Sequence, residues 1–229
     1  MNKILLGSGN FDLERYTSPC TLEVKKSTTL NAINMCTDLT LDIHVLDDAE
    51  FTLNLFDFDE ATKHKIHITT FKNSKVKINV SFIAMNDYNL EINATINGEA
   101  SSTDVNIRGI NESSNVNITL NGTANKKCKD SIINEYAKII NTSDKSNTLI
   151  PNLIVNTNEV VANHGVSIGS INDDELFYLM SKGISKSNAI KLIEEGFILS
   201  IMDSEVKERI RNVLLGRWKL WIIGKIFQC

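Results

Sequence analysis

The chain has 229 residues, of which 42% are apolar and 23% charged, and its formal net charge is −4 at pH 7. This apolar content excludes a wholly disordered chain, because it suffices to bury a core. The negative net charge argues against a nucleic-acid partner, since no global basic field is available to attract phosphates.

The cysteines and the apolar runs bear on the compartment. Cys20, Cys36, Cys128 and Cys229 form no Cys-x-x-Cys pair and no zinc-ligand spacing, so we predict free thiols in a reducing compartment. The apolar run at the N-terminus is too short for a signal-peptide core, and no apolar run approaches the length of a membrane span. These features predict a cytoplasmic protein without a membrane partner.

Residues 29–125 alternate apolar and polar side chains in short runs, most clearly at 39–45, 76–82, 90–96 and 116–120. Period two indicates strands with one buried and one solvated face, and the Thr, Val and Ile content is typical of pleated strands. The runs recur roughly every dozen residues, a spacing found in sandwiches, barrels and stacked solenoids.

Short polar connectors and coils of similar length favour the solenoid, although the periodicity leaves a sandwich open. Asn97-Gly98 and Asn121-Gly122 are predicted turns, since both residue types tolerate positive φ. Stacked coils leave unpaired N–H and C=O groups at each end of the stack. A terminal coil therefore needs a cap or another chain, which predicts a partner or a dimer.

The pattern changes after residue 126. The apolar positions of 131–140 fit helical spacing, but the β-branched content fits a strand, so both structures stay open. Residues 149–155 and 160–162 are predicted as the last strands. The helical pattern that follows divides the chain into a β domain at 1–170 and a helical subdomain at 171–229.

Three helices are expected after residue 172. Asn172 is the predicted N-cap of the first helix and Gly183 its C-cap. Ser185 caps a second helix that ends at Gly196, and helical spacing continues over 197–215. The apolar and basic tail at 218–227 is expected to pack on the core, with partner or interfacial docking as the alternative.

Several motifs follow one another between residues 151 and 198. They are Pro151-x-Leu, Asn163-His-Gly-Val-Ser-Ile-Gly169, Asp174-x-Leu-Phe-Tyr-Leu-Met-Ser-Lys-Gly183-Ile, and Ala189 followed by Gly196-Phe197. In this order and spacing they resemble the SufB/SufD core family, scaffold subunits of the SUF iron–sulfur cluster assembly machinery. The resemblance implies a mainly β chain, a right-handed parallel β-helix followed by a small C-terminal α-helical subdomain.

The sequence is closer to one branch of that family. His164-Gly165 resembles the SufD type, whereas the SufB type has His-Glu there. The SufB-type cysteine would fall at Tyr136, so this chain lacks it, and Cys128 is the nearest thiol. Family members usually carry an N-terminal helical region that this sequence lacks, which fits a minimal or a truncated member.

The resemblance implies that His164 lies at a subunit interface where a transient iron–sulfur cluster forms. A neutral imidazole can ligate iron or relay a proton, but a lone histidine can equally be a structural hydrogen-bonding group. Cys128 is a weaker candidate for a second ligand. The lysines on either side of it are expected to lower the pKa of its thiol, and a loop cysteine without a role is the alternative.

Two other polar groups are expected to have no metal-binding role. His64 and His67 stand three residues apart on a predicted strand, so their side chains should point to opposite faces. Asp57, Asp59 and Glu60 are expected in a solvated turn.

The sequence has no GxxxxGKS/T and no GxGxxG phosphate-binding motif. The resemblance implies that a SufC-like ABC ATPase hydrolyses ATP and docks on residues 172–215. The candidate contacts are Phe177, Tyr178, Lys182 and Phe197; for the aromatic rings, packing of the helices on the last coil is the alternative. A SufB/SufD-type paralogue or a second copy is the expected dimer partner.

We therefore expect a non-catalytic scaffold subunit of a SUF-type complex. A β-helix enzyme acting on polysaccharide is one alternative, which would require a cleft of charged residues along one sheet. A purely structural β-solenoid is the other alternative, and such a protein would not need the helical segment.

Overall fold

The structure is a computed structural model that describes residues 2–13, 18–33, 38–58 and 61–226, with only the backbone described for 2–3 and 217–226. Cys36, Cys229, Asp59 and Glu60 lie outside the described residues, as do the side chains of the tail at 218–227. Cys20 and Cys128 are both free and buried, as predicted for free thiols.

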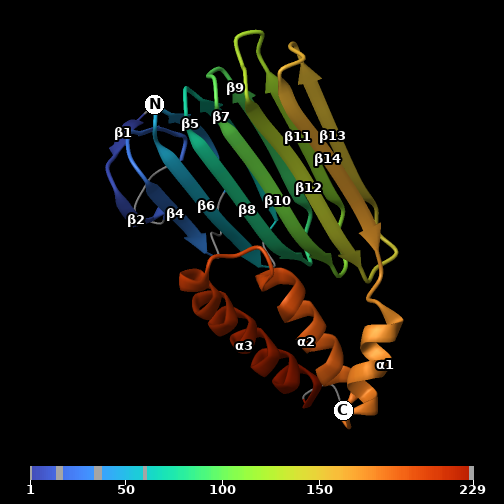
Figure 1. The fold of residues 1–229 in the computed structure, drawn as a ribbon. Coiled ribbons are helices and arrows are strands. Elements are labelled where there is room, and N and C mark those ends of the chain that lie inside the picture. Colours follow the sequence, from blue (N-terminus) through green and yellow to red (C-terminus); the bar gives the residue numbers. More distant parts are fainter. Residues whose placement is uncertain (1, 14–17, 34–37, 59–60, 227–229) are drawn as a thin grey trace.

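Two seven-stranded parallel sheets form the β part of the chain (Figure 1). The odd-strand sheet contains β1 (Asn2–Leu6), β3 (Cys20–Val24), β5 (Thr40–Val45), β7 (Thr62–Thr70), β9 (Tyr88–Ile96), β11 (Val116–Ala124) and β13 (Asn147–Val155). The even-strand sheet contains β2 (Gly9–Asp12), β4 (Thr28–Ile33), β6 (Glu50–Phe58), β8 (Lys75–Ala84), β10 (Ser102–Asn111), β12 (Ser131–Asn141) and β14 (Val160–Gly169). Each strand pairs with the strand two positions along the chain, which makes the fold a β-solenoid.

The core lies between the two sheets and consists of stacked rows of inward side chains. One such row in the odd-strand sheet runs through Leu22, Ile43 and Ile68, which are in register and almost fully buried. Outward positions of the same strands are polar and partly exposed, as in β9, where buried and half-buried residues alternate along the whole strand. The predicted fold class, a mainly β parallel β-helix followed by helices, is confirmed.

Details of the strands differ from the expectations. Segment 131–140 is a strand, β12, so the helical alternative is wrong. Asn97-Gly98 lies in the connection after β9 as predicted, but Asn121-Gly122 lies inside β11. The reason for glycine there is packing, because a Cβ on Gly122 would lie 2.5 Å from Cδ2 of Leu153. β14 also continues to Gly169, beyond the predicted end at residue 162.

Three helices follow: α1 (Asp173–Ser181), α2 (Lys186–Leu199) and α3 (Ser204–Ile226). Asn172 caps α1 by accepting a hydrogen bond from the backbone N–H of Asp174 at 2.9 Å, and Gly183 ends this turn with φ +85°. Ser185 caps α2, as predicted. The predicted end of α2 at Gly196 is wrong, because the helix continues to bury Ile198 and Leu199.

Helices α2 and α3 cover the outer face of the even-strand sheet near the carboxyl ends of its strands (Figure 1). Ile83, Ile110 and Ile140 pack there against Ile198 and Met202, in a cluster separate from the main core. The described part of the chain contains no helix that is both long and apolar enough to cross a lipid bilayer.

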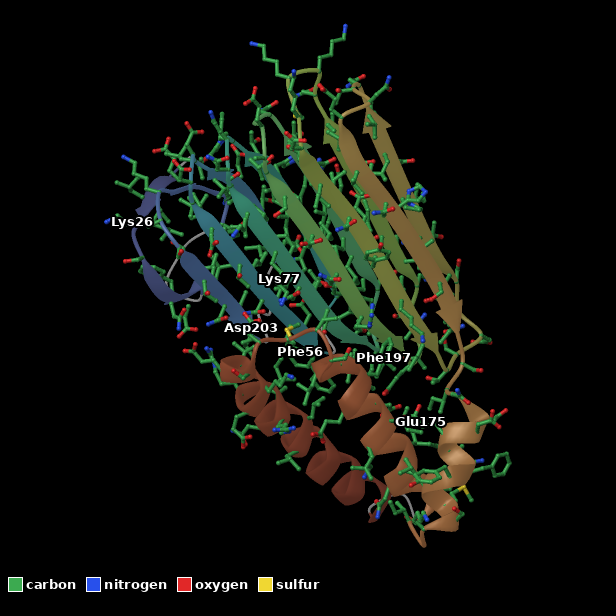
Figure 2. The ribbon with its side chains drawn as sticks, in the orientation of Figure 1. Lys26, Phe56, Lys77, Glu175, Phe197 and Asp203 are labelled. Carbon is green, nitrogen blue, oxygen red and sulfur yellow. The ribbon has the colours of Figure 1, made fainter. Side chains whose placement is uncertain are left out.

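Polar contacts also fix these helices to the sheet. The hydroxyl of Ser81 donates to the carbonyl of Ile198 at 2.8 Å, and Lys77 lies 3.5 Å from Asp203 in the α2–α3 turn (Figure 2). Arg209 on α3 lies 2.6 Å from Asp12 on β2. The helical segment is therefore attached along the sheet.

Candidate functional site at the open end of the solenoid

The predicted motif residues lie on the last coil. Pro151 is on β13, Asn163, His164 and Gly165 are on β14, and each of these strands is the edge of its sheet. Among the described residues no strand pairs with the outer side of β13 or β14, so both edges present unpaired backbone N–H and C=O groups. We call this end of the stack the open end.

The open end also exposes apolar side chains. They are Ile150, Ile154 and Val155 on β13, and Val161, Val166 and Ile168 on β14. Apolar residues gathered on an unpaired sheet edge are typical of a surface that associates with another chain.

His164 continues an inward row of the even-strand sheet. The row passes in register through Leu30, Leu53, Ile78, Val105, Glu135 and His164. It is aliphatic over the earlier coils and becomes acidic and then imidazole in the last two. His164 is exposed because no further coil covers it.

Glu135, the residue beneath His164, is fully buried. Neither carboxylate oxygen has a hydrogen-bond partner among the described residues. Burial raises the pKa of this carboxyl from 4.5 to about 7, because a low-dielectric surrounding disfavours the ionised form. Gly122 on the facing sheet leaves room for the group, since a Cβ there would lie 2.9 Å from Oε1 of Glu135.

Sequence reasoning missed Glu135. The available signal was the period-two pattern of β12, in which Ile133, Glu135, Ala137 and Ile139 share the buried face. Because the segment also fitted a helix, that inward position was not assigned.

The outward face of the same strands explains the His-Gly motif. Tyr136 and Gly165 are register partners, and a Cβ on Gly165 would lie 3.2 Å from Cδ1 of Tyr136. The two positions at which this chain departs from the SufB-type motif are therefore neighbours, and the tyrosine ring fills the space beside the glycine. Asn163 has a structural contact, donating to Oδ1 of Asn134 at 3.0 Å.

Cys128 is fully buried, and its thiol donates to the carbonyl of Ile96 at 3.0 Å. Burial raises the pKa of this thiol, so the expected lowering by the flanking lysines is wrong. Loss of solvent around the sulfur is the largest effect on this pKa. Gly169 ends β14 with open space around it, and within the described ranges no three His, Cys, Asp or Glu side chains are grouped closely enough to hold a metal ion.

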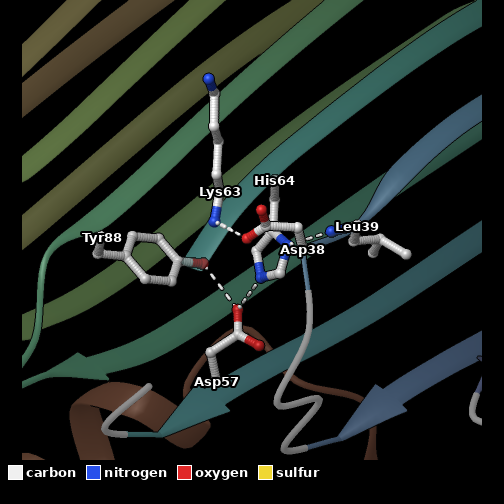
Figure 3. Close-up of polar contacts among 6 residues, drawn as sticks. All are labelled: Asp38, Leu39, Asp57, Lys63, His64 and Tyr88. Carbon is white, nitrogen blue, oxygen red and sulfur yellow. Dashed lines mark hydrogen bonds and ion pairs between the residues drawn. The ribbon is translucent and has the colours of Figure 1, made fainter. Parts of the chain in front are cut away.

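A second buried polar cluster lies deeper in the stack (Figure 3). Oδ2 of Asp57 accepts hydrogen bonds from Nε2 of His64 at 3.0 Å and from the hydroxyl of Tyr88 at 2.8 Å. The N–H of Leu39 donates to Nδ1 of His64, which fixes the tautomer with its proton on Nε2. Burial and the nearby Asp57 raise the pKa of Tyr88 well above its usual value.

These contacts correct one expectation and confirm another. Asp57 is 2% exposed, so its assignment to a solvated turn is wrong. His64 is buried whereas His67 lies on the partly exposed face, so the two histidines point to opposite faces as expected. Because the three polar groups bond to one another inside the stack, we interpret them as a structural cluster.

The candidate contacts on the helices fall into two groups. Phe177 and Tyr178 on α1 are 66% and 61% exposed, and Nζ of Lys182 lies 5.3 Å from the centre of the Tyr178 ring. These two rings do not pack the helices on the last coil, which was the alternative for them.

Phe197 instead packs in the cluster between α2 and the sheet (Figure 2). Arg108 and Lys138 approach its ring at 5.8 and 6.0 Å. The ring lines a groove of about 280 Å³ together with Lys138, Glu175 on α1 and Leu192. Phe197 therefore has a packing role between α2 and the sheet, which was the alternative to a partner contact.

The fold and this end of it define a parallel β-solenoid with an uncovered last coil and an attached helical segment. Residues 25–197 match the family described as SUF system FeS cluster assembly, SufBD core domain. The match covers most of the chain, which therefore belongs to the SufBD family.

Individual relatives match over shorter stretches. An iron–sulfur cluster assembly SufBD family protein of Mycobacterium tuberculosis (strain ATCC 25618 / H37Rv) is 41% identical over 66 residues, 27% of this chain and 17% of the relative. Iron–sulfur cluster assembly protein SufD of Bacillus subtilis (strain 168) is 32% identical over 66 residues, 29% of this chain and 15% of the relative. The SufD protein of Escherichia coli (strain K12) is 30% identical over 67 residues, 29% and 16% of the two chains.

Proposed function

We propose that this chain is a non-catalytic scaffold subunit of a SUF-type iron–sulfur cluster assembly complex in the cytoplasm. In this proposal the β domain at 1–170 joins a SufB/SufD-type paralogue or a second copy through its open end, and a transient cluster forms there near His164. The helical subdomain at 171–229 docks a SufC-like ABC ATPase that supplies ATP hydrolysis.

The open end is the observation that carries the proposal. Two unpaired parallel edges with exposed Ile154 and Val161 leave polar backbone and apolar surface in water at the same place. Pairing with another chain would satisfy the backbone groups and bury the apolar side chains. A cluster site at such an interface would be assembled only when both chains are present.

The ATPase dock is supported by the exposed rings of α1. Phe177 and Tyr178 are consecutive residues of α1, and they are 66% and 61% exposed. Exposed aromatic residues are frequent anchors of protein interfaces. The outward asparagines, by contrast, hydrogen-bond to one another along the sheets, as Asn121 does with Asn93 and Asn152, and give the polysaccharide-enzyme alternative no specific support.

The interface is tested by the oligomeric state. We expect the wild-type chain to form a dimer alone or with a co-expressed paralogue in light-scattering chromatography, and Ile154→Lys with Val161→Lys to abolish it. Met85→Lys, at another exposed apolar residue, is the control that leaves the dimer intact. A dimer that survives the paired substitution would remove the open end from the interface.

The dock and the cluster site are tested separately. We expect an ABC ATPase of the same cell to co-purify with the wild-type chain. The double substitution Phe177→Ala with Tyr178→Ala should abolish this co-purification. Leu215→Ala, at another exposed apolar residue of the helical segment, is the control that should retain it.

His164→Ala should keep the fold and the bound ATPase while reducing cluster assembly, with His67→Ala as the control. Unchanged cluster assembly in His164→Ala would exclude His164 from the site.

A further inference from the structure

We propose that Glu135 and His164 together bind a divalent first-row transition-metal cation at the open end of the solenoid. The inference rests on the proposed function only for the identity of that cation, which would be ferrous iron delivered for cluster assembly. The binding site itself follows from the packing of the last two coils.

Register places the two side chains on the same face of neighbouring strands. Glu135 and His164 are paired residues of adjacent parallel strands, and such strands lie about 4.8 Å apart with paired side chains on the same face. Both positions belong to the inward row that is aliphatic in every earlier coil from Leu30 to Val105. The row changes from hydrocarbon to two metal-ligand types in the last two coils, where His164 is exposed and Glu135 lies one strand beneath it.

The carboxylate of Glu135 lacks the partners that buried polar groups normally have. It is fully buried, and both of its oxygens are without a hydrogen bond among the described residues, although burying such a group unpaired is unfavourable. Oε1 of Glu135 lies close to the backbone of Gly122 on the facing sheet, where a Cβ would lie 2.9 Å from it, so glycine leaves room for the carboxylate itself. A buried, unpaired carboxylate one strand below an exposed imidazole is the arrangement expected of a ligand pair before metal arrives.

The two donor groups determine which metal ions the site would prefer. One carboxylate oxygen and one imidazole nitrogen suit Fe²⁺, Co²⁺ or Zn²⁺ better than a soft, thiolate-preferring ion. The thiol of Cys128 is bonded to the carbonyl of Ile96 and belongs to a separate apolar cluster. Two protein ligands leave coordination positions open, so the cation can be passed on to a cluster formed with a second chain.

The test uses Co²⁺ as the probe, added to the tag-free full chain after removal of metals with EDTA. We expect the wild type to bind about one Co²⁺ per chain, measured by its visible absorption and by titration calorimetry. Glu135→Gln and His164→Gln should each weaken binding by at least about tenfold, the lower limit already seen when residues that merely support a ligand are changed. Glu159→Gln and His67→Gln, at exposed or partly exposed positions outside the row, should bind as the wild type does.

Glutamine keeps the shape of Glu135, so the fold should be retained and far-ultraviolet circular dichroism will show it. Glu135→Asp is a second variant, which keeps the charge but withdraws the carboxylate from His164, and it should also weaken binding. The inference is overturned if the wild type binds no Co²⁺, if Glu135→Gln binds it with unchanged affinity, or if the bound ion shows thiolate charge-transfer absorption.

These outcomes are separate from those of the proposed function. Loss of the Co²⁺ site while the ATPase still co-purifies and clusters still form would refute the metal site alone. An intact Co²⁺ site in a chain that neither binds an ATPase nor supports cluster assembly would refute the scaffold function alone.

Discussion

Replacing Glu135 by glutamine tests the physical description of the open end most directly. The pKa of Glu135 is raised from 4.5 to about 7 by burial, so the folded chain holds this proton more tightly than the unfolded chain does. Stability from this group is therefore fully present below about pH 4.5 and is lost as the pH rises through about 7. Above that pH both states are ionised and the loss is complete.

The size of the effect follows from the two pKa values. They differ by about 2.5 (7 − 4.5), and one pKa unit corresponds to about 1.4 kcal/mol. The carboxylate therefore lowers the free energy of unfolding at high pH by up to about 3 kcal/mol. Glutamine is neutral throughout and has the same shape, so it should match the protonated glutamic acid at low pH and avoid the loss at high pH.

The assay is urea unfolding of both proteins at pH 5 and pH 8, followed by circular dichroism with EDTA present to exclude bound metal. The difference between the two free energies of unfolding is the informative quantity, because titrations elsewhere cancel in it. We expect Glu135→Gln to gain about 2 to 3 kcal/mol relative to the wild type between pH 5 and pH 8. Glu159→Gln, at an exposed carboxylate 3.6 Å from Lys129, should gain nothing comparable. An equal difference at both pH values would refute the reasoning, since it would mean that Glu135 is solvated or paired in the folded chain.

Three further predictions concern packing. Tyr88→Phe removes the hydroxyl that donates to Asp57 and should lower the free energy of unfolding by about 1–3 kcal/mol; no change in urea unfolding would show that Asp57 does not need this donor. Gly109→Ala places a Cβ 2.1 Å from Cζ of Phe82 and should cost about 1–3 kcal/mol, whereas Gly169→Ala, with open space, should cost less in the same assay. Ser81→Ala removes the hydrogen bond to the carbonyl of Ile198, so amide exchange of α2 should become faster; unchanged exchange would mean that packing alone holds this helix.

The sequence predicted those parts of the structure that local chemistry decides. Alternation over residues 76–82 and 90–96 specifies inward and outward faces, and repeated coils of similar length stack those faces into rows. The N-caps at Asn172 and Ser185 were correct because each depends on a hydrogen bond within its own turn. The C-cap of α1 is Lys182, and the predicted Gly183 follows it and supplies the positive φ that ends the helix. The exposed rings of Phe177 and Tyr178 were candidates because their motif could be read directly from the sequence.

The features that were predicted wrongly depend on contacts between coils, and local sequence patterns do not show which residues of different coils meet. Asp57, His64 and Tyr88 meet only because neighbouring coils are in register, so a carboxylate in a polar run became a buried acceptor. Asn121-Gly122 has the composition of a turn, yet it lies inside β11 in register with β13, where close approach of Leu153 leaves no room for a Cβ. The thiol of Cys128 was expected to be activated by nearby lysines, but burial between coils has the opposite effect on its pKa.

Among the residues that the structure describes, Asp57 and Glu135 are the buried carboxylates, and they differ in a way that indicates which one is available to a ligand. Asp57 lies among middle coils, and one of its oxygens already accepts hydrogen bonds from His64 and Tyr88. Glu135 lies one coil from the open end, and both of its oxygens lack partners among the described residues. A chain that can supply His and Tyr donors to one inward carboxylate has the means to satisfy another. Their lack around Glu135, whose register partner His164 lies on the edge strand, is best explained if the missing partner is not part of this chain.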